Sequence, residues 1–337
     1  MEAVLALDIG GTQIRAAAVT ADGSCLGRRA APTPLDHGPD AIYDVCSGLL
    51  ADVRNDLPPT MRALIRAIGI SSMGPVDPWR GVVVDPPNVL AFRNAPLADA
   101  IEQRLGLPAF LERDTNVAAL GEHWRGAAQG CRDFLYVTVS TGLGGAIFSD
   151  GALVLGPDGT AGELGHGTLI LDGPACGCGA RGHLEGIASG AGLARQARDE
   201  VAAGRSPFLV ARGADRPLTG RDVAEGDDAG DAACTRLMER ARVAFAIACV
   251  GWVNTFNPDR IVVGGTLAQR QGDRWLNPAR DAVRAQAFRA AASRVRIVPA
   301  ELGDDVGLVG AWPLVHERMG NTAWDLRRVL DGEGSSG

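Results

Sequence analysis

The chain has 337 residues, of which 46% are hydrophobic and 22% are charged, and its formal net charge is −7. At roughly 150 residues per domain this length predicts about two domains, and the composition excludes a disordered or fibrous protein. All 33 basic residues are arginine, which excludes the lysine-dependent P-loop motif and Schiff-base chemistry. No window carries a basic run, so we expect no nucleic-acid partner.

We expect neither a membrane-spanning segment nor a secretory signal in this sequence. The longest apolar run, residues 243–253, is too short to span a bilayer, so we expect no membrane partner. The first residues contain neither the basic segment nor the long apolar segment of a secretory signal. The seven cysteines are an odd number, which argues against a disulfide framework. Together these features predict a cytoplasmic protein.

The first third of the chain is predicted to alternate between strands and helices. Residues 3–9 and 14–19 are expected to form two strands joined by a glycine turn, which makes a hairpin. The periodicity of apolar residues then predicts the following elements: a helix at 39–55, a strand at 67–71, a loop-rich stretch at 76–95, a helix at 97–105, a strand at 109–111, and a helix from 115 to about 124 with Asp114 as its N-cap.

The second half of the chain opens with the same strand, glycine turn and strand. This weak internal repeat predicts two similar lobes, each offering one glycine hairpin. The expected elements are strands at 134–140 and 146–148, a loop at 172–186, a helix at 187–203, an irregular segment at 204–217, a helix at 231–253, a strand at 260–263, a helix at 277–292, a strand at 295–298 and a helix at 307–318.

Both glycine hairpins have the features of a phosphate-binding turn. Adjacent glycines let backbone N–H groups approach an anion closely, and a threonine hydroxyl adds a further donor. Asp8 lies at the end of the first strand, one residue before its last, where its carboxylate can hold a water of a phosphate-bound Mg²⁺. Two hairpins, one per lobe, favour a clamp for nucleotide phosphates. The candidate residues are Asp8, Gly10, Gly11 and Thr12, then Thr141, Gly142 and Gly144, and, after a later strand, Gly264 and Gly265.

A cluster of soft ligands follows the second hairpin. His166, Cys176, Cys178 and His183 lie within eighteen residues, and structural Zn²⁺ sites use four such N and S ligands. We therefore expect a structural zinc here. Residues 177–182 also match the G-x-G-x-x-G pattern, but a single match is weak evidence, and metal binding explains these residues better than a dinucleotide does.

These motifs together resemble the ROK family (repressors, open reading frames, sugar kinases) of the actin-like ATPase superfamily. Residues 8–15 and 140–145 resemble its two phosphate motifs. Residues 257–266 resemble its adenosine motif, except that Thr266 stands where the family usually has a third glycine. The segments 112–116, 162–166 and 176–185 resemble its sugar and zinc motifs. The resemblance implies a two-lobed α/β fold of the actin-like, ribonuclease H-like type with a cleft between the lobes. Residues 1–116 would form the smaller lobe, completed by a C-terminal helix at 307–330; residues 117–306 would form the larger lobe and 331–337 a disordered tail.

The resemblance also implies roles for individual residues. Asp114 would be the catalytic base at the sugar 6-hydroxyl, although an N-cap role would explain it too. Glu163, His166 and Glu185 would bind sugar hydroxyls, and Asn88 is a weaker candidate for that role. Arg113 stands where the family usually has asparagine, so it either points to solvent or reshapes the acceptor site. His183 stands where the family usually has a zinc-binding cysteine.

The predicted activity is transfer of a phosphoryl group from ATP, with Mg²⁺, to the 6-hydroxyl of a hexose, with glucose as the first candidate. Another hexose, an N-acetylhexosamine or a cyclitol remains an alternative acceptor, and a sugar sensor without catalysis remains an alternative function. A third alternative, a sugar-responsive repressor, would need an N-terminal DNA-binding domain, for which the seven residues before Asp8 leave no room. The resemblance further implies a homodimer or homotetramer.

Overall fold

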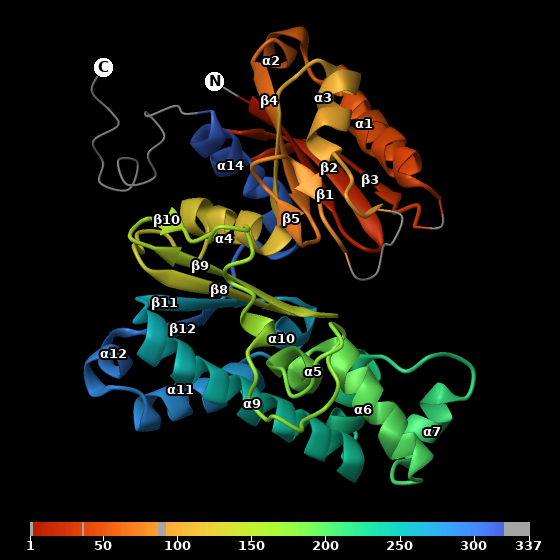
Figure 1. Cartoon of the computed structure of the whole chain (residues 1–337), viewed down its shortest axis with the longest axis vertical. Helices are drawn as coiled ribbons and strands as arrows, with labels where there is room; N and C mark the ends of the chain where they lie inside the picture. Colours follow the sequence, from red (N-terminus) through yellow and green to blue (C-terminus); the bar gives the residue numbers. More distant parts are fainter. Residues whose placement is uncertain (1–2, 36, 87–91, 320–337) are drawn as a thin grey trace. The chain divides into compact units, whose positions relative to one another are not determined.

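The computed structural model describes residues 3–35, 37–86 and 92–319 and has an α/β fold (Figure 1). It divides into two compact units. Unit 1 contains Met1–Arg132, Ile147–Ala161 and Ala300–Gly337, and unit 2 contains Asp133–Ala146 and Gly162–Pro299. The boundary expected after residue 116 therefore falls inside a helix, α4 (Asp114–Arg125). That helix packs against the C-terminal helices of unit 1, which keeps it in that unit.

Unit 1 is built on a five-stranded sheet with the order β3-β2-β1-β4-β7. β1 and β2 pair antiparallel around the first glycine turn, whereas β1, β4 and β7 run parallel. Parallel strands need crossover connections, and helices supply them here. The strands are β1 (Ala3–Ile9), β2 (Gln13–Thr20), β3 (Cys25–Pro32), β4 (Ile65–Ser72) and β7 (Ala109–Arg113).

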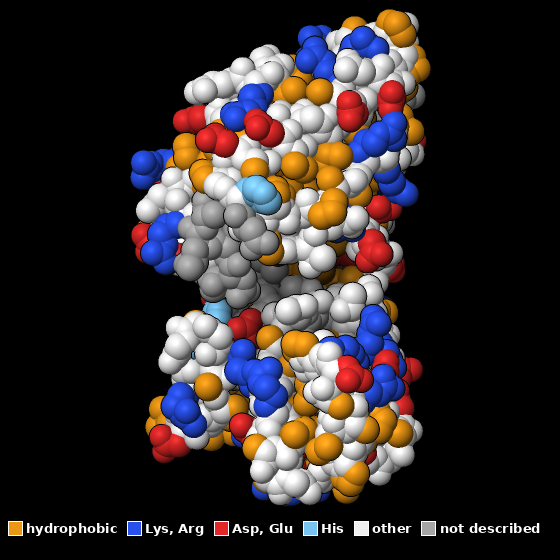
Figure 2. Space-filling view, turned by 90° about the vertical axis from the view of Figure 1, so that its right-hand side faces the viewer, with side chains coloured by type: hydrophobic (Ala, Val, Ile, Leu, Met, Phe, Trp, Pro, Cys, Tyr) orange, Lys and Arg blue, Asp and Glu red, His pale blue; other side chains and the backbone are white. Residues whose placement is uncertain are grey.

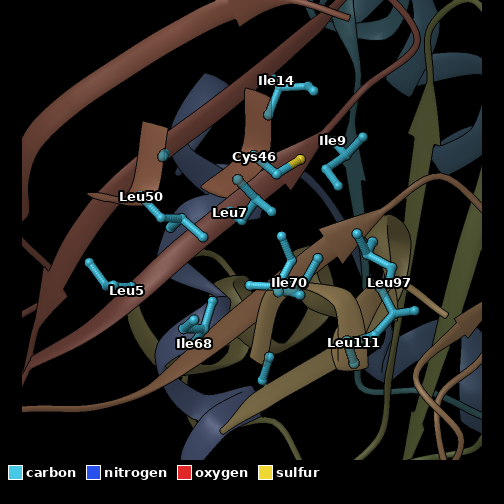
Figure 3. Packing of buried hydrophobic residues seen from close by; sticks show 14 of the residues in the cluster. Leu5, Leu7, Ile9, Ile14, Cys46, Leu50, Ile68, Ile70, Leu97 and Leu111 are labelled. Carbon is cyan, nitrogen blue, oxygen red and sulfur yellow. The ribbon is translucent and has the colours of Figure 1, made fainter. Parts of the chain in front are cut away.

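Helices cover both faces of this sheet, so β1 is buried along its whole length. Alternate residues of β1 point to opposite faces. Leu5, Leu7 and Ile9 pack with α1 and α3 on one face, as Figure 3 shows for part of this core. Val4 and Ala6 pack on the other face with α13 and α14. The helices are α1 (Pro39–Asp56), α2 (Pro59–Arg62), α3 (Leu97–Leu105), α4, α13 (Val306–Val309) and α14 (Ala311–Arg318).

Unit 2 contains most of the second five-stranded sheet, whose order is β10-β9-β8-β11-β12. β8, β11 and β12 run parallel, and the long helix α9 packs beside α11 and α8. The strands are β8 (Phe134–Val139), β9 (Leu143–Ser149), β10 (Ala152–Leu153), β11 (Arg260–Gly264) and β12 (Arg296–Pro299). A separate two-stranded ladder in unit 1 joins β5 (Val76–Asp77) and β6 (Val82–Val83).

The helices of unit 2 lie between β10 and β12 in the sequence. They are α5 (Leu184–Ala188), α6 (Gly190–Ala202), α7 (Pro207–Gly213), α8 (Gly220–Asp228), α9 (Ala232–Phe256), α10 (Thr266–Gln271), α11 (Asp273–Gln286) and α12 (Arg289–Arg294). Short 3-10 turns are η2 (Leu164–His166) in unit 2 and η3 (Gly303–Asp305) in unit 1.

Most predicted elements are present, and the differences have local causes. The segment 204–217 is not irregular, because Ser206 caps α7 and Pro207 occupies its first position. The expected single helix at 307–318 is two helices separated by Gly310. β3 and α8 were not predicted. The predicted tail at 331–337 and the helix residues beyond 319 lie outside the described residues.

Charges of both signs intermingle on the face of the molecule in Figure 2, in agreement with the scattered arginines of the sequence. Among the described residues, no helix is both long enough and apolar enough to cross a membrane.

Candidate functional site

The first glycine hairpin lies at the end of β1 in unit 1. Gly10 donates its N–H to the Gln13 carbonyl at 3.0 Å, which closes the turn. The Thr33 hydroxyl donates to the Gly10 carbonyl at 2.7 Å and fixes the turn from β3's far end. Gly11 and Thr12 at the tip are exposed. Their backbone is therefore accessible to an anion, as the sequence predicts for a phosphate turn.

Asp8 is held by two partners just below this hairpin. In the β1–β2 register Asp8 lies opposite Arg15, and Arg15 donates Nε (3.1 Å) and Nη2 to Asp8 Oδ2. The Ser71 hydroxyl donates to Asp8 Oδ1 at 2.8 Å. A carboxylate oxygen is the ligand type that Mg²⁺ prefers, so Asp8 fits the predicted role. A Mg²⁺ ion at Asp8 would compete with Arg15 for Oδ2.

Asp114 lies at the same edge of the sheet as this hairpin. The register across β1, β4 and β7 places Ile9, Ser72 and Arg113 in one row, and Asp114 follows directly. Two strand spacings separate β1 from β7, about 10 Å. Asp114 is the first residue of α4, not its N-cap as predicted, and its Oδ1 accepts the N–H of Thr115 at 2.7 Å. The positive end of the helix there favours an ionised carboxylate.

Arg113 is the N-cap residue of α4 and is only 4% exposed. Its Nη2 donates to Asn116 Oδ1 at 3.2 Å and to the Ala161 carbonyl at 2.8 Å. Its side chain passes Gly74, where an added Cβ would lie 3.0 Å from Arg113 Cδ. The alternative in which Arg113 points to solvent is therefore wrong. The guanidinium instead bonds α4 and the Ala161 carbonyl, and the aliphatic part of the side chain packs against Gly74.

Glu112 supports this corner of unit 1 from below and is fully buried. Its Oε1 accepts the Arg113 N–H at 2.8 Å and the Asn116 amide at 3.0 Å. Its Oε2 accepts from Arg318 Nη2 at 2.9 Å. Because a buried carboxylate needs such partners, this network fixes the backbone from which Asp114 projects.

The second glycine hairpin and the predicted adenosine motif meet in unit 2. The Ser140 N–H donates to the Gly142 carbonyl at 2.9 Å, and Ser140 Oγ lies 2.9 Å from Thr266 Oγ1. Gly265 has φ +89°, and an added Cβ would lie 2.5 Å from the Val139 carbonyl oxygen. Only glycine fits this approach. The contact joins the carboxyl ends of β8 and β11.

A cavity of about 840 Å³ opens beside these two motifs, within unit 2. Its lining contains hydroxyl groups, the first residues of α6, α8 and α10, and five arginines, but no acidic residue of the described chain. Arg216 pairs with the buried Asp222 and lowers the pKa of that carboxyl to about 2. Anion-binding helix ends and cations suit a nucleotide. The lining is Ser140, Thr141, Gly190, Ala191, Ala194, Arg195, Arg198, Arg216, Leu218, Thr219, Gly220, Arg221, Thr266, Leu267 and Arg270.

The four predicted metal ligands lie together in unit 2. One ligand atom from each of His166, Cys176, Cys178 and His183 lies within 4.8 Å of the others. His183 Nδ1 is 3.3 Å from His166 Nδ1 and 3.4 Å from Cys178 Sγ. Two imidazoles and two thiols at this spacing fit a tetrahedral Zn²⁺ site.

His166 presents its two ring nitrogens to different neighbours. Nδ1 faces the cluster, 3.7 Å from Cys176 Sγ, whereas Nε2 lies 3.8 Å from Glu163 Oε2. Glu163 precedes η2 and is 37% exposed at its side chain. One ring can therefore bind a metal through Nδ1 and keep Nε2 beside Glu163, which suits the two predicted roles of His166.

Glu185 contacts the cluster and the second hairpin at once. Its Oε2 accepts the Leu143 N–H at 3.0 Å, and its Oε1 accepts the Cys176 thiol at 3.3 Å. Burial raises the pKa of that thiol to about 12. The remaining sugar-binding candidate, Asn88, lies outside the described residues.

Comparison with known proteins assigns the chain to a family. The ROK family profile matches residues 4–318. The chain belongs to the ROK family. A glucokinase of Halalkalibacterium halodurans is 33% identical over 93% of this chain and 94% of its own. An N-acetylmannosamine kinase of Escherichia fergusonii is 32% identical over 91% and 96%. A ROK glucokinase of Streptomyces griseus, solved with glucose and AMPPNP, has 32% identity and a TM-score of 0.75, over 92% and 97%.

The fold is thus the two-lobed actin-like ATPase fold of ROK sugar kinases. Two site residues of this ROK protein escaped the sequence analysis. Arg15 could have been found, because a tight turn centred on Gly11 and Thr12 places it opposite Asp8. Arg195 shows no sequence signal, since its place depends on packing of α6; its Nε and Nη2 are buried and have no hydrogen-bond partner among the described residues.

Proposed function

We propose that this ROK protein is an ATP-dependent sugar kinase that phosphorylates a hexose at the 6-hydroxyl, with glucose as the first candidate. One observation carries the proposal: the parallel register of β1, β4 and β7 places Asp114 and the first phosphate hairpin at one edge of the same sheet. In-line phosphoryl transfer requires the hydroxyl acceptor and the phosphoryl donor to lie next to each other.

Asp114 would act as the general base. Its carboxylate would accept the proton of the sugar hydroxyl as the new O–P bond forms. The network of Glu112 and Arg113 fixes the start of α4, which holds the carboxylate in place between turnovers. Pre-organisation of this kind lowers the barrier without any covalent intermediate.

The donor would be ATP, held by both hairpins and by the arginine-lined cavity of unit 2. Because the chain has no lysine, backbone N–H groups, arginines and Mg²⁺ would balance the charge of the phosphates. Mg²⁺, when bound with the phosphates, supplies that positive charge. Asp8 is the residue that would hold it.

Glu163, His166 and Glu185 would bind sugar hydroxyls, since a carboxylate accepts and an imidazole N–H donates. The four-residue cluster would hold a structural Zn²⁺ that fixes the loop carrying His166. In this proposal Arg113 shapes the acceptor site, because it occupies the space beside Asp114 with a donor-only group. The acceptor therefore loses the amide contact that asparagine offers other family members.

Two broader features belong to the same proposal. The kinase would work in the cytoplasm, where ATP is available, and as a homodimer or homotetramer. Light scattering coupled to size-exclusion chromatography tests the assembly: a mass near 70 or 140 kDa, two or four times the 35.0 kDa chain, supports it. A monomer at micromolar concentration contradicts it.

The activity is tested by ADP release from MgATP with a panel of acceptors. The panel contains glucose, mannose, fructose, N-acetylglucosamine, N-acetylmannosamine and myo-inositol, and no acceptor serves as the background. Turnover on glucose above the others supports the proposal. Preference for N-acetylmannosamine would support the kinase activity but replace glucose as the proposed substrate. Sugar binding without ADP release would favour the alternative of a sugar sensor.

A further inference from the structure

The two segments that carry the metal ligands also pack against the second glycine hairpin and bond to it. On one side lies η2, whose last residue is the ligand His166 and whose first two residues pack against the hairpin. A Cβ added to Gly165 would lie 1.8 Å from the Leu143 carbonyl oxygen, and one added to Gly145 would lie 2.6 Å from Leu164 Cδ1. These approaches leave no room for side chains. Any shift of η2 must therefore move the hairpin backbone as well.

The other ligand segment docks on the same hairpin through hydrogen bonds. His183 is the N-cap residue of α5, and α6 follows immediately. The N–H of Gly190 donates to the Ser140 carbonyl and the N–H of Ala191 to the Thr141 carbonyl, both at 2.8 Å. The first turn of α6 thus fixes the two carbonyls that begin the phosphate turn.

Glu185 connects the cluster and the hairpin directly. Glu185 stands in the first turn of α5, two residues after the ligand His183, and its Oε2 accepts the Leu143 N–H. Its Oε1 lies 3.3 Å from the sulfur of the ligand Cys176. Gly142 lies against it: an added Cβ would be 3.1 Å from Oε2. Glu185 therefore contacts the hairpin backbone at two consecutive residues, Gly142 and Leu143.

We propose that metal occupancy of the His166, Cys176, Cys178 and His183 cluster sets the affinity of the second hairpin for the donor phosphates, with Glu185 as the positioning residue that connects them. The inference rests on the proposed function, in which this hairpin binds ATP. A bound metal fixes the loop around Cys176 and Cys178, which would otherwise lose conformational freedom when phosphate binds. Through its bond to Leu143, Glu185 then limits the conformational freedom of the hairpin whose N–H groups would contact the phosphates.

The test measures nucleotide binding without turnover. The full chain is titrated with Mg²⁺ and a non-hydrolysable ATP analogue in the absence of sugar, by calorimetry. Wild type, Glu185→Ala and the control Asp172→Asn are compared in zinc-loaded, chelator-stripped and reloaded forms. Asp172 is an exposed acid in the same loop, so the control changes charge there without touching the hairpin.

We expect stripping to weaken analogue binding by about fivefold or more in wild type and in Asp172→Asn, and reloading to restore it. Zinc-loaded Glu185→Ala should already bind more weakly, and stripping should change its dissociation constant by less than about twofold. Equal losses in all three proteins, or none in folded stripped wild type, would overturn the inference.

Two further readouts keep the result interpretable. Thermal melting reports whether stripped protein is folded, and if it is not, the zinc-loaded Glu185→Ala and Glu185→Gln variants decide alone. Their analogue affinity must fall, with the glutamine variant between alanine and wild type, because one oxygen can still accept from Leu143. Wild-type affinity in both variants would overturn the inference. Failure of zinc-loaded wild type to bind the analogue would instead overturn the proposed function.

Discussion

The two glycine hairpins look alike in sequence but are supported in different ways. The hairpin at Gly10 and Gly11 is stabilised within its own sheet, by the register of β1 with β2 and by the Asp8–Arg15 pair. The hairpin at Thr141 and Gly142 is stabilised from outside, by Glu185 and the first turn of α6. The comparison teaches that two hairpins with the same phosphate motif can respond differently to the same kind of mutation. The first hairpin should depend on charge, and the second on the metal loop.

The largest expected effect concerns the edge of the sheet that the first hairpin shares with Asp114. Asp114→Asn should lower kcat by about 10²–10⁴-fold, the usual contribution of a general base. KM for glucose and for ATP should change little, because the amide keeps the shape of the side chain. Steady-state kinetics checks this. The control is Asp99→Asn, an exposed acid in the first turn of α3, which should retain full activity.

The second prediction concerns pH and His123 in α4 of unit 1. Burial lowers the pKa of His123 to about 4, against a partial rise from its bond to the Cys131 carbonyl. The unfolded chain therefore binds more protons between pH 4 and 6.5. The contribution of His123 to the free energy of unfolding is fully present above about pH 6.5. It is lost as the pH falls towards 4, and the loss is about 2 kcal/mol at pH 5.

Denaturant titrations at pH 7 and pH 5 measure this loss. In His123→Gln, whose side chain does not titrate and can still donate to the Cys131 carbonyl, the difference between the two pH values should shrink by about that 2 kcal/mol. An unchanged difference would mean that another group dominates the acid response.

The third prediction breaks the ion pair of the first hairpin. Arg15→Gln should lower the free energy of unfolding by about 1 kcal/mol, because the pair is partly buried, with Asp8 12% and Arg15 32% exposed at their side chains. Arg29→Gln is the matched control, since its pair with Asp56 is 44% and 50% exposed; it should cost less than about 0.5 kcal/mol. Equal losses would contradict the assigned role of burial.

The fourth prediction compares one glycine from each hairpin. A Cβ at Gly11 meets no atom of the described residues within 4 Å, whereas one at Gly142 lies 3.1 Å from Glu185 Oε2. Gly11→Ala should therefore leave the melting temperature unchanged and weaken only phosphate binding. Gly142→Ala should lower the melting temperature by a few degrees, the shift of about 1 kcal/mol in a chain of this size. Melting curves with and without the ATP analogue separate the two effects.

Much of the fold and part of the site could be predicted because their signals are local. The strands around Gly10–Gly11 show an apolar pattern beside a turn, and the cysteine and histidine spacing alone indicated the metal cluster. Ser206 and Pro207 carried the start signal of α7, so that helix could have been found. These features depend on neighbours within a few residues.

The remaining features depend on contacts far apart in the chain. Arg113 is buried because it meets the Ala161 carbonyl and Gly74, which no periodicity connects to it. Glu185 reaches Leu143 across 42 residues. The resemblance assigned Glu185 to the sugar, and its bond to the hairpin became visible only in the structure.

The most direct test of the central claim is to identify the product. Wild type and Asp114→Asn are incubated with MgATP and glucose, and the products are analysed by phosphorus NMR. The account predicts glucose 6-phosphate and ADP in equal amounts from wild type, and a yield lower by orders of magnitude from the variant. ADP with inorganic phosphate and no sugar phosphate, or equal yields from both proteins, would contradict it.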